Sequence, residues 1–461
     1  MTLTSEKNLI QIAKNRGFSI EIADGDFGEN VDHRLLYQAG LDNEAMPIVV
    51  FSECYLPDEK LVDYDLLVEK IKKKFNDLVE SDYTIVYFAS SEVQKPSWTW
   101  LINTYHLLDR KFKKNLKHMY LVHPSTWTKI LLNTFGTIIS NKFYSKLVYV
   151  DNLEQLNHLI PTKHMSIPES VIEYDSKLDH SAYKTPIVKT VAEIKSKNAQ
   201  KTLFGANVSD IVTTPKNSEV QTLPLKVATW LLILHKNGTF TKNIFRHRPT
   251  LFNLTTLRHK IQANPNVSSY ELDTESCGYH NDIHAVASLL KLFFYELQPP
   301  IFNRSLVEIV KDLPVAESKE DIADISVALD LERDRIDFIK SKILPEIPAE
   351  YRQLLAHLFC VLNNISHNSQ DNKMTAHSLA MVWAPILIDW DNIDNNTCLQ
   401  MTSVCPAIPS VGSIIQNIIQ YFYIIFSDEI HAILDVEYIH SETLMAQMEN
   451  ALNQQLSIYR N

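Results

Sequence analysis

The stretch DIHAVASLLKLFFYEL, residues 282–297, repeats apolar side chains at intervals of three and four residues. That interval is the period of an α-helix, and the scarcity of polar positions predicts a helix that is buried over most of its surface. Lys291 interrupts the apolar run, so its ammonium group must either extend to solvent or point at a partner. The stretch therefore predicts both the core of a helical domain and a candidate functional side chain.

The same periodicity recurs on both sides of this stretch and predicts an all-α domain over residues 203–430. The segments that carry it are LPLKVATWLLILHKN (223–237), YRQLLAHLFCVLNNISH (351–367), TAHSLAMVWAPIL (375–387) and VGSIIQNIIQYFYIIF (411–426). Residues 431–461 are predicted to form a C-terminal helical tail, because apolar residues recur there every four positions. We expect this helix to dock on its own domain, with a dimerisation seam as the alternative.

Residues 45–175 are predicted to form an α/β domain, because short β-branched and aromatic runs alternate with helical patterns. The strand-like runs are MPIVVFSECYLP (46–57), DYTIVYFAS (82–90), HMYLVHP (118–124) and KLVYVDNL (146–153), and the helix-like runs are DYDLLVEKIKKKFNDLV (63–79) and SWTWLINTYHLLDRKFKKNL (97–116). Residues 1–44 precede this domain as an N-terminal extension. The polar, lysine-rich residues 176–202 are predicted to link the two domains.

The composition excludes several classes of protein. A formal net charge of −11 in 461 residues argues against a nucleic-acid partner, because such proteins need an excess of lysine and arginine. The five cysteines are scattered and form no C-x-x-C pair, and the N-terminus has no signal-peptide pattern, so we expect a cytoplasmic protein. With nine glycines and no glycine-rich phosphate loop, the chain is predicted to bind no nucleotide cofactor of its own.

The stretch TKNIFRHRPT, residues 241–250, places Arg246 and Arg248 in a loop that contains no carboxylate. In one interpretation, Ile244 and Phe245 anchor the loop and the arginine is solvated. In the other, the Arg246 guanidinium is aimed at negative charge on a partner, as an arginine finger is. A loop on a rigid scaffold is a suitable place for such a side chain.

Two further groups of polar residues are candidates for binding. His284, Lys291 and Tyr295 share one face of the 282–297 helix, which predicts a polar face turned toward a partner. His280 and His284 have the spacing of a metal pair, but no third ligand follows, so no metal site is predicted. A basic run in the first domain is a solvated helix end or a docking patch for anionic lipid or an acidic protein face. Its members are Arg110, Lys111, Lys113, Lys114 and Lys117.

Three segments in fixed order, NIFRHRP (243–249), DIHAVASLLKLFFYELQPPIF (282–302) and QDNKMTAHSLAMVWAPIL (370–387), resemble the motifs of a RhoGAP domain. Upstream, VVFSECYLP, VESDYTIVYF, KPSWTWL, DRKFKKNLKHMYLVHPS and KLVYVDNLEQL resemble the BCH subclass of CRAL-TRIO-like domains. The two together resemble the BCH–RhoGAP proteins over residues 45–430.

This resemblance implies a GTPase-activating protein for Rho-family small GTPases of the Rho, Rac or Cdc type. Arg246 matches the family's finger arginine, and Lys291 matches the lysine that supports the finger loop. The resemblance implies that GTP, Mg²⁺ and the glutamine that orients the attacking water belong to the GTPase. It also implies that the BCH domain associates with GTPases, lipids or further BCH domains, with peripheral membrane contact as one consequence.

Several positions depart from the family pattern. Asn243 replaces a glycine, and asparagine is one of the few residues that tolerate a positive φ. Tyr295, Ser378 and Ile386 stand where the family has an arginine and two asparagines, which predicts a GTPase interface with fewer polar groups. The alternative function is therefore a scaffold that binds Rho-family GTPases without stimulating hydrolysis. The residues predicted to contact the GTPase besides Arg246 and Lys291 are Arg248, His284, Tyr295, Ser378 and Ile386.

Overall fold

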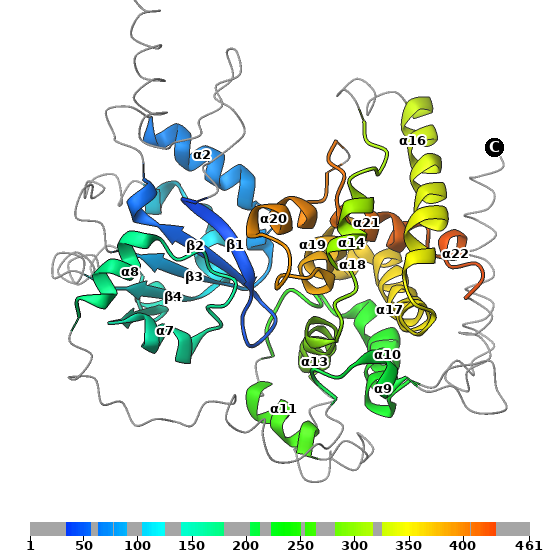
Figure 1. The fold of residues 1–461 in the computed structure, drawn as a ribbon, viewed down its shortest axis with the longest axis horizontal. Coiled ribbons are helices and arrows are strands. Elements are labelled where there is room, and N and C mark those ends of the chain that lie inside the picture. Colours follow the sequence, from blue (N-terminus) through cyan, green and yellow to red (C-terminus); the bar gives the residue numbers. More distant parts are fainter. Residues whose placement is uncertain are drawn as a thin grey trace, which may run out of the picture. The chain divides into compact units, whose positions relative to one another are not determined.

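A computed structural model of the chain describes residues 34–56, 63–76, 78–89, 104–124, 140–178, 203–212, 223–249, 254–263, 282–316, 325–405 and 407–429. The chain divides into two compact units, Met1–Asn198 and Ala199–Asn461. The first contains a sheet and helices, and the described part of the second is helical, which confirms the predicted fold classes (Figure 1). Most of the N-terminal extension and of the linker, and the helical tail, fall outside the described residues.

The first unit is built on a five-stranded sheet whose strand order, β1-β2-β3-β4-β5, is also the chain order. β1 pairs antiparallel with β2, and the remaining neighbours are parallel. The strands are β1 (Leu36–Leu41), β2 (Pro47–Ser52), β3 (Tyr83–Phe88), β4 (Leu116–Val122) and β5 (Leu147–Val150). The helical elements are η1 (Glu53–Tyr55), α2 (Tyr64–Phe75), η2 (Leu78–Glu80), α4 (Arg110–Asn115), α6 (Asn141–Tyr144), α7 (Leu153–Leu159) and α8 (Glu169–Ser176).

The helices cover the sheet on both faces. Right-handed crossovers that step in one direction across a parallel sheet place their helices on the same face. Accordingly, α2, α4 and α6 lie over one face, where Ile71, Phe112 and Phe143 join a single apolar cluster. The chain passes to the other face after β5, and Figure 1 shows α2 and α7 on opposite sides of the sheet.

β1 was not predicted, because its sequence LYQAGL has no β-branched residue and contains glycine and glutamine. It is nevertheless buried at every position and extends the sheet into residues assigned to the N-terminal extension. The predicted helix over 97–116 is wrong as one continuous helix, because its described part is interrupted at Leu108 and Asp109, and α4 ends at Asn115 where β4 begins at Leu116. Tertiary packing and edge pairing therefore decide both boundaries against local propensity.

The second unit packs its apolar helices around a core that includes Trp230 and Trp383, both fully buried. Its elements are α9 (Val208–Ile211), α10 (Leu225–Asn237), η5 (Gly238–Phe240), α11 (Leu254–Ala263), α13 (Ile283–Glu296), α14 (Arg304–Val310), α16 (Ile325–Phe338), η7 (Ile339–Ile343), η8 (Leu344–Glu346), α17 (Ala349–His367), α18 (Ser369–Asn372), α19 (Ala376–Leu387), α20 (Asn395–Thr402), α21 (Val411–Gln420) and α22 (Phe422–Ile425). The five periodic stretches correspond to α10, α13, α17, α19 and the α21–α22 pair. The more polar α11 and α16 were not predicted.

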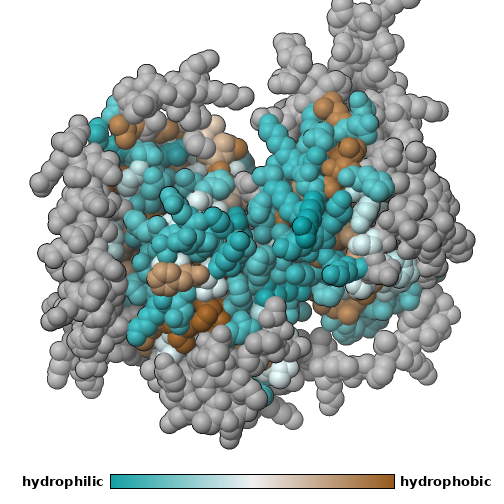
Figure 2. Space-filling view, turned by 180° about the vertical axis from the view of Figure 1, so that it is seen from behind, coloured by the Kyte–Doolittle hydropathy of each residue, from teal (hydrophilic) through white to brown (hydrophobic). Residues whose placement is uncertain are grey.

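Among the described residues, no helix is both long and apolar enough to cross a bilayer. The face of the molecule shown in Figure 2 is mainly hydrophilic where it is described, with small hydrophobic patches between polar side chains. The same described part of the chain contains no cluster of three histidine, cysteine or acidic side chains arranged to hold a metal ion.

Candidate functional site: the Arg246 loop and the sheet cavity

The loop that carries Arg246 has an unusual backbone. Asn243 has a φ of 56° and Phe245 a φ of 70°, so two non-glycine residues occupy the left-handed region within one turn. An asparagine tolerates this region, as the sequence predicts, but a bulky aromatic residue rarely occupies it and must be held there by its surroundings. The loop is closed by a hydrogen bond from the Arg246 backbone N–H to the Asn243 carbonyl, at 3.0 Å.

The two apolar residues of the loop anchor it in the core, as expected. Ile244 is fully buried and Phe245 is 1% exposed. The Phe245 ring packs edge-on against Trp383 of α19, with 5.3 Å between ring centroids. Burial of a large aromatic side chain stabilises its position by a few kcal/mol, which is enough to offset the about 1–3 kcal/mol that an unfavourable φ costs.

Lys291 lies beneath the loop. Its side chain is 1% exposed, and its Nζ donates to the Phe245 carbonyl at 3.0 Å. The prediction that α13 turns a polar face toward a partner is therefore wrong at Lys291, because this side chain does not reach the surface. A buried ammonium is stable only with polar partners, and the Phe245 carbonyl is one of them. Lys291 thus fixes the backbone directly before Arg246.

Asn372, which the sequence reading did not single out, organises the other side of the loop. It is fully buried, and its Nδ2 donates to the carbonyls of Thr239 and Ile365 at 2.8 and 2.7 Å. Its Oδ1 accepts from the Met374 N–H at 2.7 Å, and its own carbonyl accepts from the Asn243 N–H at 2.7 Å. An asparagine within the NKM segment, directly before a predicted helix, was the only available signal.

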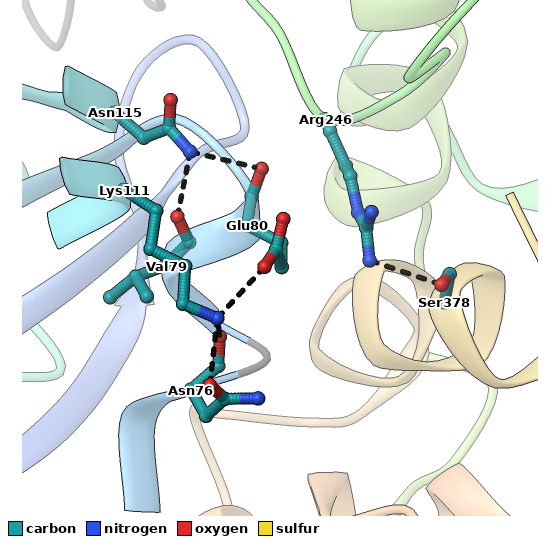
Figure 3. Close-up of polar contacts among 7 residues, drawn as sticks. All are labelled: Asn76, Val79, Glu80, Lys111, Asn115, Arg246 and Ser378. Carbon is teal, nitrogen blue, oxygen red and sulfur yellow. Dashed lines mark hydrogen bonds and ion pairs between the residues drawn. The ribbon is translucent and has the colours of Figure 1, made fainter. Parts of the chain in front are cut away.

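The Arg246 side chain lies against α19 in the unbound chain (Figure 3). Its Nη2 donates to the Ser378 hydroxyl oxygen at 3.0 Å, and the whole residue is 8% exposed. Ser378 stands in the first turn of α19, where its backbone N–H donates to the N-cap side chain of Thr375. The solvated-arginine interpretation therefore does not describe this state.

The remaining predicted contact residues fall into two groups. Arg248 and His284 are partly exposed, and the His284 ring, at the start of α13, lies 6.2 Å from the ring of His247, which was not predicted as a contact. Tyr295, near the end of the same helix, is also partly exposed. Ile386 is only 2% exposed and belongs to the core of α19. Their contact with a GTPase stays a prediction, and for Ile386 the burial weighs against it.

The basic run of the first unit is largely engaged within that unit. The Lys111 ammonium lies 2.8 Å from the Glu80 carboxylate and donates to the Asn76 side chain at 2.7 Å (Figure 3). Lys113 and Lys117 likewise contact a backbone carbonyl and an aspartate of the same unit. A docking patch at this end of α4 therefore depends on the two cations that are exposed. These are Arg110 and Lys114.

The first unit also contains a cavity of about 220 Å³ between the sheet and α2. Its lining is almost entirely apolar, and Tyr83 and Tyr87 are among the lining residues. Burial raises the pKa of both tyrosines, for Tyr87 with a smaller contribution from Glu53, so both are neutral at physiological pH. The lining residues are Leu36, Val49, Phe51, Val68, Ile71, Phe75, Val79, Tyr83, Ile85, Tyr87, Thr104, Leu108, Phe112 and Met119.

Comparison with known proteins finds a matching domain family for each of the two units. The family described as a divergent CRAL/TRIO domain matches residues 45–177, and the RhoGAP domain family matches residues 224–392. Rho GTPase-activating protein 1 of Homo sapiens is 30% identical over 359 residues, which are 77% of this chain and 76% of that protein. Caytaxin of Mus musculus is 37% identical over 153 residues, which are 32% of this chain and 40% of that protein.

Among solved structures, the crystal structure of human Rho GTPase activating protein 15 matches 52% of this chain and 99% of that chain, with 22% identity and a TM-score of 0.38. The extent of the match to Rho GTPase-activating protein 1, together with the two domain families in this order, shows the family. The chain belongs to the Rho GTPase-activating proteins that carry a divergent CRAL/TRIO domain followed by a RhoGAP domain.

Proposed function

We propose that this protein accelerates GTP hydrolysis on Rho-family small GTPases by supplying Arg246 in trans. The RhoGAP domain and the Rho GTPase-activating relatives support GTPase activation and imply Rho-family partners. The observation that carries the finger assignment is the loop itself. Lys291 and Asn372, both buried, hold a strained backbone whose central side chain is an arginine.

The chemistry suits a guanidinium. Hydrolysis of GTP places negative charge on the oxygens of the transferring phosphoryl group, and a planar cation with several N–H donors stabilises that charge. A loop that is already fixed in place loses little conformational entropy when it enters another protein's active site. In this proposal GTP, Mg²⁺ and the water-positioning glutamine belong to the GTPase, and this chain adds positive charge at the phosphate.

One observation favours the alternative of a scaffold without activity. The guanidinium that should enter the GTPase is buried against Ser378 in the unbound chain, and Ile386 offers no polar group at the surface. A domain in which the finger stayed at Ser378 would bind a GTPase without stimulating it.

Single-turnover GTP hydrolysis on purified Rho, Rac and Cdc-type GTPases separates the two functions. The full chain should accelerate hydrolysis on at least one of them, by roughly 10³ to 10⁵ for a working arginine finger. Arg246→Ala should lose nearly all of this, whereas Arg333→Ala, a substitution at an exposed arginine of α16, should not. Binding of GTP-loaded GTPase without any acceleration would establish the scaffold instead.

For the first unit we propose an apolar ligand, such as an acyl or isoprenoid chain, as one form of the association expected of this domain. The uncharged, apolar cavity of about 220 Å³ supports it, because such a site desolvates hydrocarbon without burying polar groups. A matched pair of substitutions on α2 tests it. Val68 lines the cavity and is 2% exposed, whereas Leu66 faces outward and is 42% exposed.

The probe is a fluorescent farnesyl or acyl analogue titrated into the full chain. Binding should saturate near one equivalent, fall at least tenfold in affinity for Val68→Trp, and persist in Leu66→Trp. Equal binding by the two variants would remove the cavity as the site and leave protein association as the role of this unit.

A further inference from the structure

The resting position of the Arg246 side chain has consequences for activation. The residue is 8% exposed, yet the proposed function requires its guanidinium to reach a phosphate on another protein. Side chain and backbone are held separately. The backbone is fixed through Phe245 and Asn243, whereas the guanidinium is held on α19 through Ser378. The side chain can therefore leave α19 while the loop keeps its conformation.

The electrostatics of this position are unfavourable for a cation. Ser378 is the third residue of α19, whose N-cap is Thr375, so the guanidinium lies at the positive end of the helix dipole. Helix N-termini stabilise anions and destabilise cations within the first turn. An acceptor oxygen is therefore needed there to hold the arginine, and the Ser378 hydroxyl supplies it at 3.0 Å. The same oxygen accepts a second hydrogen bond from the Thr375 hydroxyl at 3.1 Å, which fixes it in place.

We propose that Ser378 is a positioning residue that holds Arg246 in a withdrawn state, which a GTPase must displace before the finger can act. This inference rests on the proposed function and deepens it. The withdrawn state lowers the fraction of molecules whose Arg246 is ready to enter the GTPase. It therefore raises the apparent activation free energy of stimulated GTP hydrolysis by the free energy of the Ser378 contact. An anion brought to this place by the partner competes with Ser378 for the guanidinium and is favoured by the same helix end.

Two variants distinguish a Ser378 that holds the Arg246 guanidinium from a Ser378 that only supports the fold. Ser378→Ala removes the acceptor, and Ser378→Thr keeps the hydroxyl as the conservative rescue. Both are made in the full chain, and unfolding in urea checks that both remain folded. Each is also made in the Arg246→Ala background, in which an effect that acts through the guanidinium must disappear.

The first readout needs no GTPase. Phenylglyoxal modifies accessible guanidinium groups, and mass spectrometry of the Arg246 peptide gives its rate of modification. Ser378→Ala should raise this rate roughly 10- to 150-fold, as expected for loss of one hydrogen bond to a charged group. Ser378→Thr should match the wild type. An unchanged rate in Ser378→Ala would overturn the proposal, whether or not the protein activates any GTPase.

The second readout is kcat/KM for activated GTP hydrolysis. Ser378→Ala should raise it by a similar factor of roughly 10 to 150, because less free energy is needed to release the finger. A purely structural role predicts the opposite, a loss of activity. Lower activity in Ser378→Ala, restored in Ser378→Thr, would overturn withdrawal and assign Ser378 to the reacting geometry. Absence of wild-type activation on every GTPase would count against the proposed function alone, since the modification rate still decides the resting position.

Discussion

The Arg246 loop and the sheet cavity are organised by opposite means. At the loop, buried polar groups of Lys291, Asn372 and Ser378 each contact a defined partner, and the backbone adopts a conformation that it would not adopt alone. At the cavity, apolar side chains of β2, β3 and α2 meet without filling the space between them. The conformation of the loop depends on hydrogen bonds with fixed geometry, whereas the cavity exists because the apolar side chains around it leave space unfilled. The two should therefore respond differently to substitution.

The largest loss of stability is expected at Asn372. Asn372→Ala removes three side-chain hydrogen bonds in a fully buried site, which should lower the free energy of unfolding by roughly 3 kcal/mol or more. Urea unfolding followed by fluorescence of the buried Trp230 and Trp383 reports on this unit. Asn368→Ala is the matched control, because its Nδ2 lies 3.4 Å from the same Thr239 carbonyl and the residue is partly exposed. Equal losses for the two variants would contradict the role assigned to Asn372.

Lys291 should affect activity more than stability. Lys291→Met removes the desolvation cost of a buried charge together with the hydrogen bond that the charge makes. These two changes affect the free energy of unfolding in opposite directions and partly cancel. The Phe245 carbonyl loses its donor, however, and the loop loses its fixed position. We expect activated hydrolysis to fall by roughly 10- to 100-fold, measured in single turnover.

The control for this prediction is Lys226→Met. Lys226 is also 1% exposed, and its Nζ donates to the Ile261 carbonyl of α11 at 3.4 Å. Its substitution should leave hydrolysis within a few-fold of wild type. If both methionine variants lost activity alike, the loss would reflect general disturbance of the unit and not support of the finger.

The cavity gives a contrast between neighbours in one strand. Val49 and Val50 of β2 point to opposite faces of the sheet, and only Val49 lines the cavity. Val50→Phe should cost roughly 1–3 kcal/mol by overpacking, whereas Val49→Phe should cost less than about 1 kcal/mol because space is available. Urea denaturation of the first unit measures both. Equal costs would mean that the cavity closes in solution.

The last prediction concerns the pH dependence of stability. Burial lowers the pKa of Lys226 to about 8, whereas an unfolded lysine titrates at about 10.4. Between these values the unfolded chain binds a proton that the folded chain does not, so stability rises with pH over this range. Relative to Lys226→Met, the wild type should gain on the order of 1 kcal/mol per pH unit between about pH 8 and 10. If the free energy of unfolding changed with pH in the same way for the two proteins, this prediction would be contradicted.

The difference between the loop and the cavity also explains which parts of the fold and the site could be predicted from the sequence. The helix α13 was predicted correctly because its residues are apolar at almost every position. The sequence singled out Arg246, Lys291 and Ser378 because residue identity within a motif predicts their chemistry, and their roles stay predictions. Their mutual contacts could not be predicted, since Ser378 lies 132 positions from Arg246. β1 and the cavity were missed for a different reason. Edge pairing and incomplete packing are properties of the assembled sheet, and no local pattern in LYQAGL or PIVVFS encodes them.

The most direct test of the account compares two states of one GTPase. The full chain and Arg246→Ala are titrated against a responsive Rho-family GTPase loaded either with a non-hydrolysable GTP analogue or with GDP and aluminium fluoride, which imitates the transferring phosphoryl group. If Arg246 stabilises the transition state, the alanine variant should bind the first form within a few-fold of wild type and lose roughly 10³-fold or more in affinity for the second. Equal affinities for the second form would contradict the assignment of Arg246 as the finger.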